Sequence, residues 1–138
     1  MNLVAEYRLR NDLAESRQIE GWIQSFAEAA RLSPAARNAF DHALVEWVTN
    51  VISHAYDDTR EHWIAVRFLI SPGQARVEVE DDGREFNPLT LPPVDTTAPL
   101  ERRAIGGLGV HMIRQFMDSV QYRRAEGRNI LTMTRRTV

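Results

Sequence analysis

Glu46 and Asn50 stand four residues apart in a segment whose apolar residues recur with the spacing of a helix. On a helix the two side chains share one face and lie one turn apart. Such a pair alone is usually a polar stripe on an amphipathic helix. Here apolar residues such as Trp47 and Val51 flank the row on both sides, so it runs beside the packed face rather than opposite it. The pair is therefore a candidate site for chemistry.

Asp81 ends a segment in which apolar and polar residues alternate as in a strand. The alternation puts its carboxylate on the same side as Val77 and Val79, where burial without a hydrogen-bonding partner is costly. Two interpretations stay open: a simple Asp-Gly turn, or an acceptor at a strand end that faces the amino group of a ligand. Asp82 falls on the other face and suits solvent.

Three glycines precede an apolar-periodic segment that predicts a helix over 107–118: Gly106, Gly107 and Gly109. Glycines permit close approach of the backbone, and the start of a helix carries partial positive charge. Together these features favour a phosphate, although a tight turn has the same composition. No strand directly precedes the glycines, which disfavours a Rossmann dinucleotide site.

In this order, the three segments resemble the nucleotide-binding (Bergerat) fold shared by gyrase, Hsp90, histidine kinases and MutL. Within that group they look most like the small bacterial anti-sigma factor serine kinases, and the resemblance covers nearly the whole chain. The family's Asn box, Asp-x-Gly box and Gly-rich box are similar to EWVTNVISHAY, VEVEDDGREFNP and IGGLGVHMIRQFMD. Two positions depart from the pattern: Glu85 replaces a frequent second glycine, and Asn87 replaces an aspartate.

The resemblance implies a role for each matching position. Asn50 would coordinate Mg²⁺, which also bridges the phosphates of ATP. Asp81 would accept from the adenine amino group, and Gly83 would let the backbone approach the base. Glu46 would be the general base that takes the proton from the attacking hydroxyl.

The same resemblance implies a lid over ATP at about residues 84–105. The phosphates would be lined by the glycines at the helix start, Gly106, Gly107 and Gly109. Arg102 and Arg103 lie at the end of the lid. One of them reaches the γ-phosphate, since the chain has no lysine to do so, or the two form a solvated pair on a loop.

The last strand would supply a further polar contact to adenine, and the sequence leaves Asn129 and Thr132 as alternatives. The arginines around the final hairpin are expected to be surface charges: Arg123, Arg124 and Arg128. The four histidines fall in different elements, which disfavours a metal site built from them: His42, His54, His62 and His111.

The elements that must position these residues follow from periodicity, caps and turns. Strands are expected at 3–10, 62–70, 75–81, 119–125 and 128–136, and helices at about 12–31, 34–56 and 107–118. We therefore expect one histidine-kinase-like ATPase domain over 1–138. Its fold would be a two-layer α/β sandwich, with a mixed sheet of about five strands and three main helices on one face.

Composition excludes several kinds of chemistry. The chain has no cysteine, so thiol catalysis and cysteine-based metal sites are excluded. All 17 basic residues are arginine, which excludes a P-loop or Schiff-base lysine. A net charge of −2 and the absence of a long apolar run predict neither nucleic-acid nor membrane binding. We expect a soluble cytoplasmic protein.

The function implied by the resemblance is that of an ATP-dependent protein-serine kinase and anti-sigma factor in a partner-switching module. It would phosphorylate a serine of a small anti-sigma factor antagonist, with ATP and Mg²⁺. The alternative is a non-catalytic ATP-binding module of the same fold, and a partner-switching adaptor outside transcription also stays open. The catalytic half of a histidine kinase is disfavoured, because no helical hairpin with a phospho-acceptor histidine precedes the domain. A homodimer is expected, since a two-layer fold leaves one sheet face uncovered.

Overall fold

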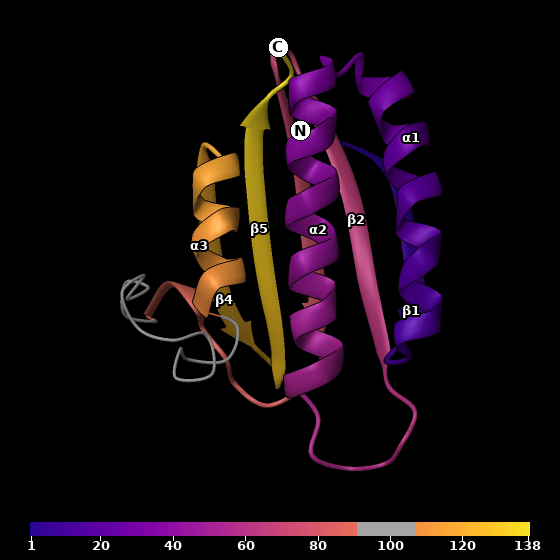
Figure 1. Cartoon of the computed structure of the whole chain (residues 1–138), viewed down its shortest axis with the longest axis vertical. Helices are drawn as coiled ribbons and strands as arrows, with labels where there is room; N and C mark the ends of the chain where they lie inside the picture. The colour runs from indigo at the N-terminus through magenta and orange to yellow at the C-terminus, as the bar shows by residue number, and fades with distance from the viewer. Residues whose placement is uncertain (91–106) are drawn as a thin grey trace.

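A computed structural model describes residues 1–90 and 107–138. Five strands form one sheet in the order β1-β2-β3-β5-β4 (Figure 1). The strands are β1 (Asn2–Arg10), β2 (Trp63–Ser71), β3 (Gln74–Asp81), β4 (Ser119–Ala125) and β5 (Arg128–Arg136). The helices are α1 (Ile19–Ala30), α2 (Pro34–His54) and α3 (Gly107–Phe116), with short 3-10 turns η1 (Leu13–Gln18) and η2 (Pro88–Thr90). All three α-helices cover the same face of the sheet.

The expected two-layer α/β sandwich is confirmed, but the expected mixed sheet is wrong. Each of the four strand pairings within the described residues is antiparallel. The reason lies in the connections. Two helices, α1 and α2, join β1 to β2, so the chain reverses direction three times and β2 runs antiparallel to β1. The single crossover through α3 joins β3 to β4, but β5 lies between those two strands and runs opposite to both.

Capping residues fix the starts of the helices as the sequence predicts. The Asp12 carboxylate accepts from the Ala14 N–H at 2.9 Å, and the Ser33 hydroxyl accepts from the Ala36 N–H at 3.1 Å. Pro34 occupies the first turn of α2, where its missing N–H costs nothing. The expected helix over 12–31 is divided: its first six residues form η1, and the α-helix begins at Ile19.

The core lies between the helices and the sheet. Ile64, Val66 and Phe68 alternate along β2 toward the helices and are fully buried. The Phe26 ring of α1 packs against Phe40 of α2 and Phe68, with ring centroids 5.7 and 4.7 Å away. Each such side chain contributes about 1.5–3 kcal/mol through removal of apolar surface from water. This packing holds α2, and therefore Glu46 and Asn50, rigidly over the sheet.

The opposite face of the sheet carries ion pairs rather than helices. The Arg67 guanidinium on β2 bridges Glu78 and Glu80 on β3, at 3.2 and 3.1 Å. Arg128 on β5 reaches Glu80 at 3.3 Å. The homodimer expected from this uncovered face stays a prediction. No helix in the described part of the chain is long and apolar enough to cross a membrane.

Candidate functional site

Helix α2 presents the expected Glu–Asn pair at its middle. Asn50 is 7% exposed, and Glu46 is half-buried one turn before it. The Asn50 amide nitrogen donates to the Glu46 carbonyl at 2.9 Å and to the Glu46 carboxylate at 3.3 Å. Among residues 1–90 and 107–138, no donor reaches the Asn50 amide oxygen. That oxygen is therefore free to act as a ligand.

Asp81 lies at the end of β3, on the face that the helices cover, as strand alternation predicts. It is 1% exposed. Its Oδ1 accepts from the Asn129 amide and from the Gly83 backbone N–H, each at 2.9 Å. No hydrogen bond from the described residues reaches Oδ2. Burial raises the pKa of the Asp81 carboxyl, while the donors from Asn129 and Gly83 act to lower it. The arrangement offers one carboxylate oxygen as an acceptor.

Gly83 has a reason to be glycine that the sequence did not reveal. A Cβ added to it would lie 2.6 Å from both the Cβ and the carbonyl oxygen of Ala55, the residue that ends α2. The Arg84 N–H then donates to that same carbonyl at 2.9 Å. The turn after Asp81 is thus packed against the end of α2, which brings the Asp81 and Asn50 elements together.

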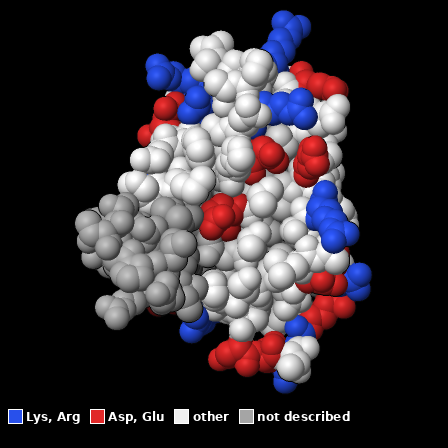
Figure 2. Space-filling view, in the orientation of Figure 1, with Lys and Arg blue, Asp and Glu red and all other residues white. Residues whose placement is uncertain are grey.

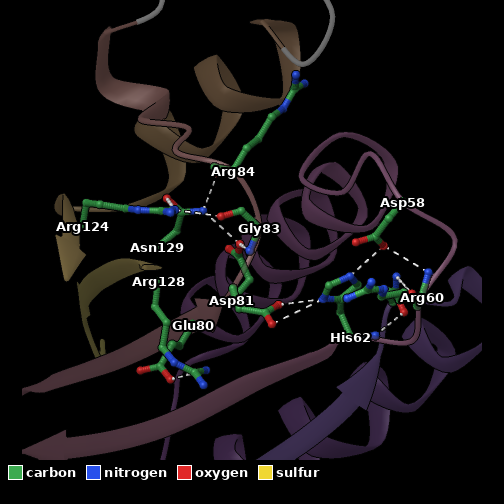
Figure 3. Close-up of polar contacts among 12 residues, drawn as sticks. Asp58, Arg60, His62, Glu80, Asp81, Gly83, Arg84, Arg124, Arg128 and Asn129 are labelled. Atoms are coloured by element: carbon green, nitrogen blue, oxygen red, sulfur yellow. Dashed lines mark hydrogen bonds and ion pairs between the residues drawn. The ribbon is translucent and has the colours of Figure 1, made fainter. Parts of the chain in front are cut away.

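Asn129 on β5 joins this turn to the edge strand. It is 2% exposed and lies opposite Asp81 in the strand register. Its amide nitrogen donates to Asp81 Oδ1 and, at 2.8 Å, to the Arg84 carbonyl. Its amide oxygen accepts from Arg124 Nη1 at 3.0 Å (Figure 3). The same oxygen accepts from the Tyr122 hydroxyl. Asn129 is thus on Asp81's side of the sheet.

The structure places the two alternatives for the last strand on opposite faces of the sheet. Thr132 pairs with Glu78 in the register, so it lies on the uncovered face, away from Asp81. Arg124 is exposed, as expected of a surface charge, and it also donates to the Gly83 carbonyl at 2.8 Å and to Asn129. The alternation of residues along an edge strand does not predict a contact between residues so far apart in the chain.

Helix α3 begins at Gly107, so Gly107 and Gly109 lie in its first turn. The helix packs against α2, with Val110 and Ile113 buried. Its backbone N–H groups at this end favour an anion. Gly106, Arg102, Arg103 and most of the expected lid, residues 91–106, lie outside the described residues.

An aromatic contact fixes the segment that follows the Asp81 turn. The Phe86 ring stacks on Trp47 of α2, with centroids 5.7 Å apart and planes within 7°. Trp47 is neighbour to Glu46 in the sequence, so the stack ties this segment to the helix that carries the candidate base. Nothing in the spacing of the residues predicts this pairing.

A second polar cluster lies beside the first. The His62 ring contacts Asp58 through Nε2 at 2.8 Å (Figure 3). Its Nδ1 contacts Asp82 at 3.1 Å. Its ring also stacks on Tyr56, with centroids 4.3 Å apart. The hydrogen bond to Asp58, with help from Asp82, raises the pKa of His62. Among the described residues, no group of three or more His, Asp or Glu side chains is arranged so that it could hold a metal ion.

The helix-covered face carries acidic side chains in its middle, and both acidic side chains and arginines lie toward its margins (Figure 2). A groove between α1 and α2 is lined by Glu20, Glu28 and Asp41, among other residues. It shares no residue with the site around Asp81 and Asn50. The candidate site is therefore the region where α2, the end of β3 and the start of α3 converge.

Comparison with known proteins agrees with this geometry. The model of the histidine kinase-like ATPase domain family matches residues 9–135. The serine-protein kinase RsbW of Listeria monocytogenes is 30% identical over 113 residues, which cover 79% of this chain and 72% of that protein. The serine/threonine-protein kinase BtrW of Bordetella bronchiseptica is 27% identical over 115 residues, covering 82% and 80%.

Solved structures show the same fold. The RsbU and RsbW domains of a Mycobacterium tuberculosis protein superpose with a TM-score of 0.66 at 16% identity, covering 96% of this chain. This chain spans only about a third, 32%, of that solved chain. The histidine kinase domain from a blue-light activated kinase of Erythrobacter litoralis gives a TM-score of 0.57 at 18% identity, covering 91% and 60%.

Proposed function

Since the chain belongs to the histidine kinase-like ATPase family, in the branch of the anti-sigma factor serine kinases, we propose that it is an ATP-dependent protein-serine kinase that also binds a sigma factor. The observation that carries this proposal is the free Oδ2 of buried Asp81, beside an α2 that bears Asn50 and Glu46. A carboxylate oxygen at this position suits the 6-amino group of adenine.

The phosphates of ATP would extend from the Asp81 end of the site toward the start of α3. Backbone N–H groups at Gly107 and Gly109 would donate to them, and the helix N-terminus would favour their negative charge. Gly106 would line the phosphates as well, and Arg102 or Arg103 of the lid would reach the γ-phosphate. The lid would cover the nucleotide over about residues 84–105.

The residues fit a magnesium ion at Asn50. Its amide nitrogen is engaged by Glu46, which leaves the amide oxygen, a hard neutral ligand, without a donor among the described residues. Mg²⁺ bound there would neutralise charge on the phosphates of ATP. Because the amide nitrogen is hydrogen-bonded to Glu46, the oxygen is the end of the Asn50 amide that faces the site.

Glu46 would serve as the general base. In the transfer, the serine Oγ forms a bond to the γ-phosphorus while the bond from phosphorus to the β,γ-bridging oxygen breaks, and ADP leaves with that electron pair. The hydroxyl proton passes to the Glu46 carboxylate, which stays half-exposed and reachable from outside. Phosphoryl transfer needs positioning and charge stabilisation more than covalent chemistry, which suits so small a site.

The protein substrate would be a serine of a small anti-sigma factor antagonist. A phosphoserine adds a charge of about −1.5 to −2, which breaks complementarity at an interface. The antagonist would then dissociate and leave this protein to hold the sigma factor in the cytoplasm. We propose that the active species is a homodimer, which sedimentation at micromolar concentration tests directly.

A non-catalytic nucleotide-binding module of the same fold is the second candidate function. The half-exposed Glu46, one turn from the proposed magnesium ligand, favours the kinase over it. The deciding experiment uses ATP labelled on its γ-phosphate and the small antagonist proteins of the same genome, added one at a time. Transfer of label to one antagonist supports the kinase. Tight ATP and partner binding without transfer supports the module.

A further inference from the structure

The Asn129 side chain is the point at which the Asp81 turn, β5 and the edge strand β4 are joined. Five hydrogen bonds converge on one buried amide: its nitrogen donates to two acceptors and its oxygen accepts from three donors. The donors to the oxygen include the Phe86 backbone N–H at 3.4 Å. A fully satisfied buried network of this kind holds the segments that it joins in one arrangement.

We propose that Asn129, itself oriented by Arg124, is a positioning residue that keeps Asp81 Oδ2 available as the acceptor for a 6-aminopurine. The inference rests on the proposed nucleotide site. Neither Asn129 nor Arg124 need touch the base in this arrangement, since both act through Asp81.

Arg124 acts with the Phe86 N–H and the Arg84 carbonyl to determine which way the amide points. A guanidinium has only donors, so the amide end that faces Arg124 Nη1 at 3.0 Å must be the oxygen. The nitrogen end is then directed at Asp81 Oδ1, 2.9 Å away. Arg124 is itself anchored, because the same Nη1 donates to the Gly83 carbonyl at 2.8 Å.

In this orientation the two oxygens of the Asp81 carboxylate have different partners. Oδ1 is occupied by the Asn129 amide and the Gly83 N–H. Oδ2 receives no hydrogen bond from the residues that the structure describes, so it is the oxygen left for a ligand donor. If the Asn129 nitrogen were lost, Oδ1 would keep only one donor and the carboxylate could rotate.

Loss of Asn129 also has an electrostatic consequence. Burial raises the pKa of Asp81, and the Asn129 hydrogen bond is the strongest influence that lowers it. The other charged or titratable groups facing Asp81 are Asp82 in its own turn, Tyr56 after α2, and Tyr122 and Arg124 on β4. Without Asn129 the carboxyl takes up a proton at higher pH, and a protonated carboxyl is a poor acceptor for the purine amine.

The test is calorimetry with ADP and with IDP, which has a 6-oxo group, from pH 5 to pH 8. We compare wild type with Asn129→Leu and with Thr132→Val, a matched control on the other face of the same strand. Asn129→Leu should weaken ADP binding by about tenfold or more at pH 7, by the cost of one unmet buried hydrogen bond. Its loss of ADP affinity on acidification should begin at higher pH, and its preference for ADP over IDP should shrink. Thr132→Val should match wild type.

A second pair of variants keeps the inference testable if Asn129→Leu fails to fold. Arg124→Met removes one of the three donors that orient the amide, whereas Arg124→Lys restores a donor-only group. Since Arg124 lies on an exposed edge strand, both should fold. In Arg124→Met, the loss of ADP affinity on acidification should also begin at a higher pH than in wild type, with a smaller shift than in Asn129→Leu. Arg124→Lys should largely restore the wild-type pH dependence.

The outcomes separate this inference from the proposed function. If wild type binds ADP and the Asn129 and Arg124 variants show the same affinity and pH profile, the positioning role is overturned and the nucleotide site stands. If wild type binds no adenine nucleotide at any pH, both are overturned.

Discussion

Asp81 and Asn129 stand opposite each other on the neighbouring strands β3 and β5, and the amide of one donates to the carboxylate of the other at 2.9 Å. The pair occupies the end of the sheet where the helix layer meets the turn at Gly83. The Asp81 carboxylate is 1% exposed to solvent. Its Oδ1 accepts from Asn129 and Gly83, whereas Oδ2 accepts no hydrogen bond from the described residues. The first prediction follows from this asymmetry.

Asp81→Asn should weaken binding of ATP and ADP by about 10- to 100-fold. The new amide oxygen would stay with the donors of Asn129 and Gly83, so the new NH₂ would replace Oδ2 and face the purine amine, donor against donor. An unmet buried donor costs about 1–3 kcal/mol. Calorimetry measures the effect, with Asp82→Asn, an exposed neighbour, as the control. Equal ATP affinity in Asp81→Asn and wild type would remove Asp81 from the site.

The sequence alone predicted the parts of this site that depend on local periodicity. Alternation along 77–81 placed Asp81 on the buried face, and helical spacing placed Glu46 beside Asn50. It left Asn129 and Thr132 as alternatives, because Ile130 and Leu131 are both apolar and blur the alternation in that strand. Only pairing with β3 fixes which of the two faces inward.

Contacts between distant segments were beyond prediction for a related reason. Arg124 carries no pattern that distinguishes it from Arg123, yet it reaches the Gly83 carbonyl 41 residues away in the chain. The sequence predicted a mixed sheet, because it shows the number and spacing of the strands but not which strands are neighbours. The order of the strands in the sheet determines whether neighbouring strands run parallel or antiparallel. Gly83 could be read as a turn glycine, but its tight fit against Ala55 needs the position of α2.

Gly83→Ala should destabilise the protein by about 1–3 kcal/mol, the usual cost of overpacking. The added Cβ would lie 2.6 Å from the Ala55 carbonyl, and backbone cannot easily move away. Gly21→Ala in α1 is the matched control, since nothing lies within 4 Å of its added Cβ and alanine favours a helix. Urea unfolding should show the first variant less stable and the second equal to or more stable than wild type. A Gly83→Ala protein as stable as wild type would contradict the packing argument.

His62 should make the stability depend on pH. Its hydrogen bonds to Asp58 and then Asp82 raise its pKa above the ordinary 6.5, so the protonated form is favoured in the folded state. The stabilisation is therefore complete below pH 6.5 and is lost as pH rises through the raised pKa. The difference in unfolding free energy between wild type and His62→Gln should shrink from about pH 6 to pH 8. A difference that stays constant or grows over this window would show that the pairing contributes nothing; His54→Gln is the control.

Asn50→Ala should abolish the dependence of ATP binding on Mg²⁺. In wild type, removal of Mg²⁺ with a chelator should lower ATP affinity, because the metal would join the Asn50 amide oxygen to the phosphates. In the variant, affinity should be low with or without the metal. Alanine is the better helix former, so α2 should remain intact by circular dichroism. Asn38→Ala, at an exposed position of the same helix, should behave as wild type. A variant that still binds ATP more tightly with Mg²⁺ would exclude Asn50 as the ligand.

Glu46→Gln should separate binding from chemistry. Glutamine keeps the shape of the side chain and an oxygen for the Asn50 amide, which contacts the Glu46 carboxylate at 3.3 Å. It removes the charge that would accept the serine proton. ATP and partner binding should therefore stay near wild type, while phosphate transfer slows by about 10²–10⁴-fold, the usual contribution of a general base. The assay follows label from ATP to the antagonist under single-turnover conditions, with Glu28→Gln on α1 as the charge-matched control. Equal transfer rates in Glu46→Gln and wild type would exclude Glu46 as the base.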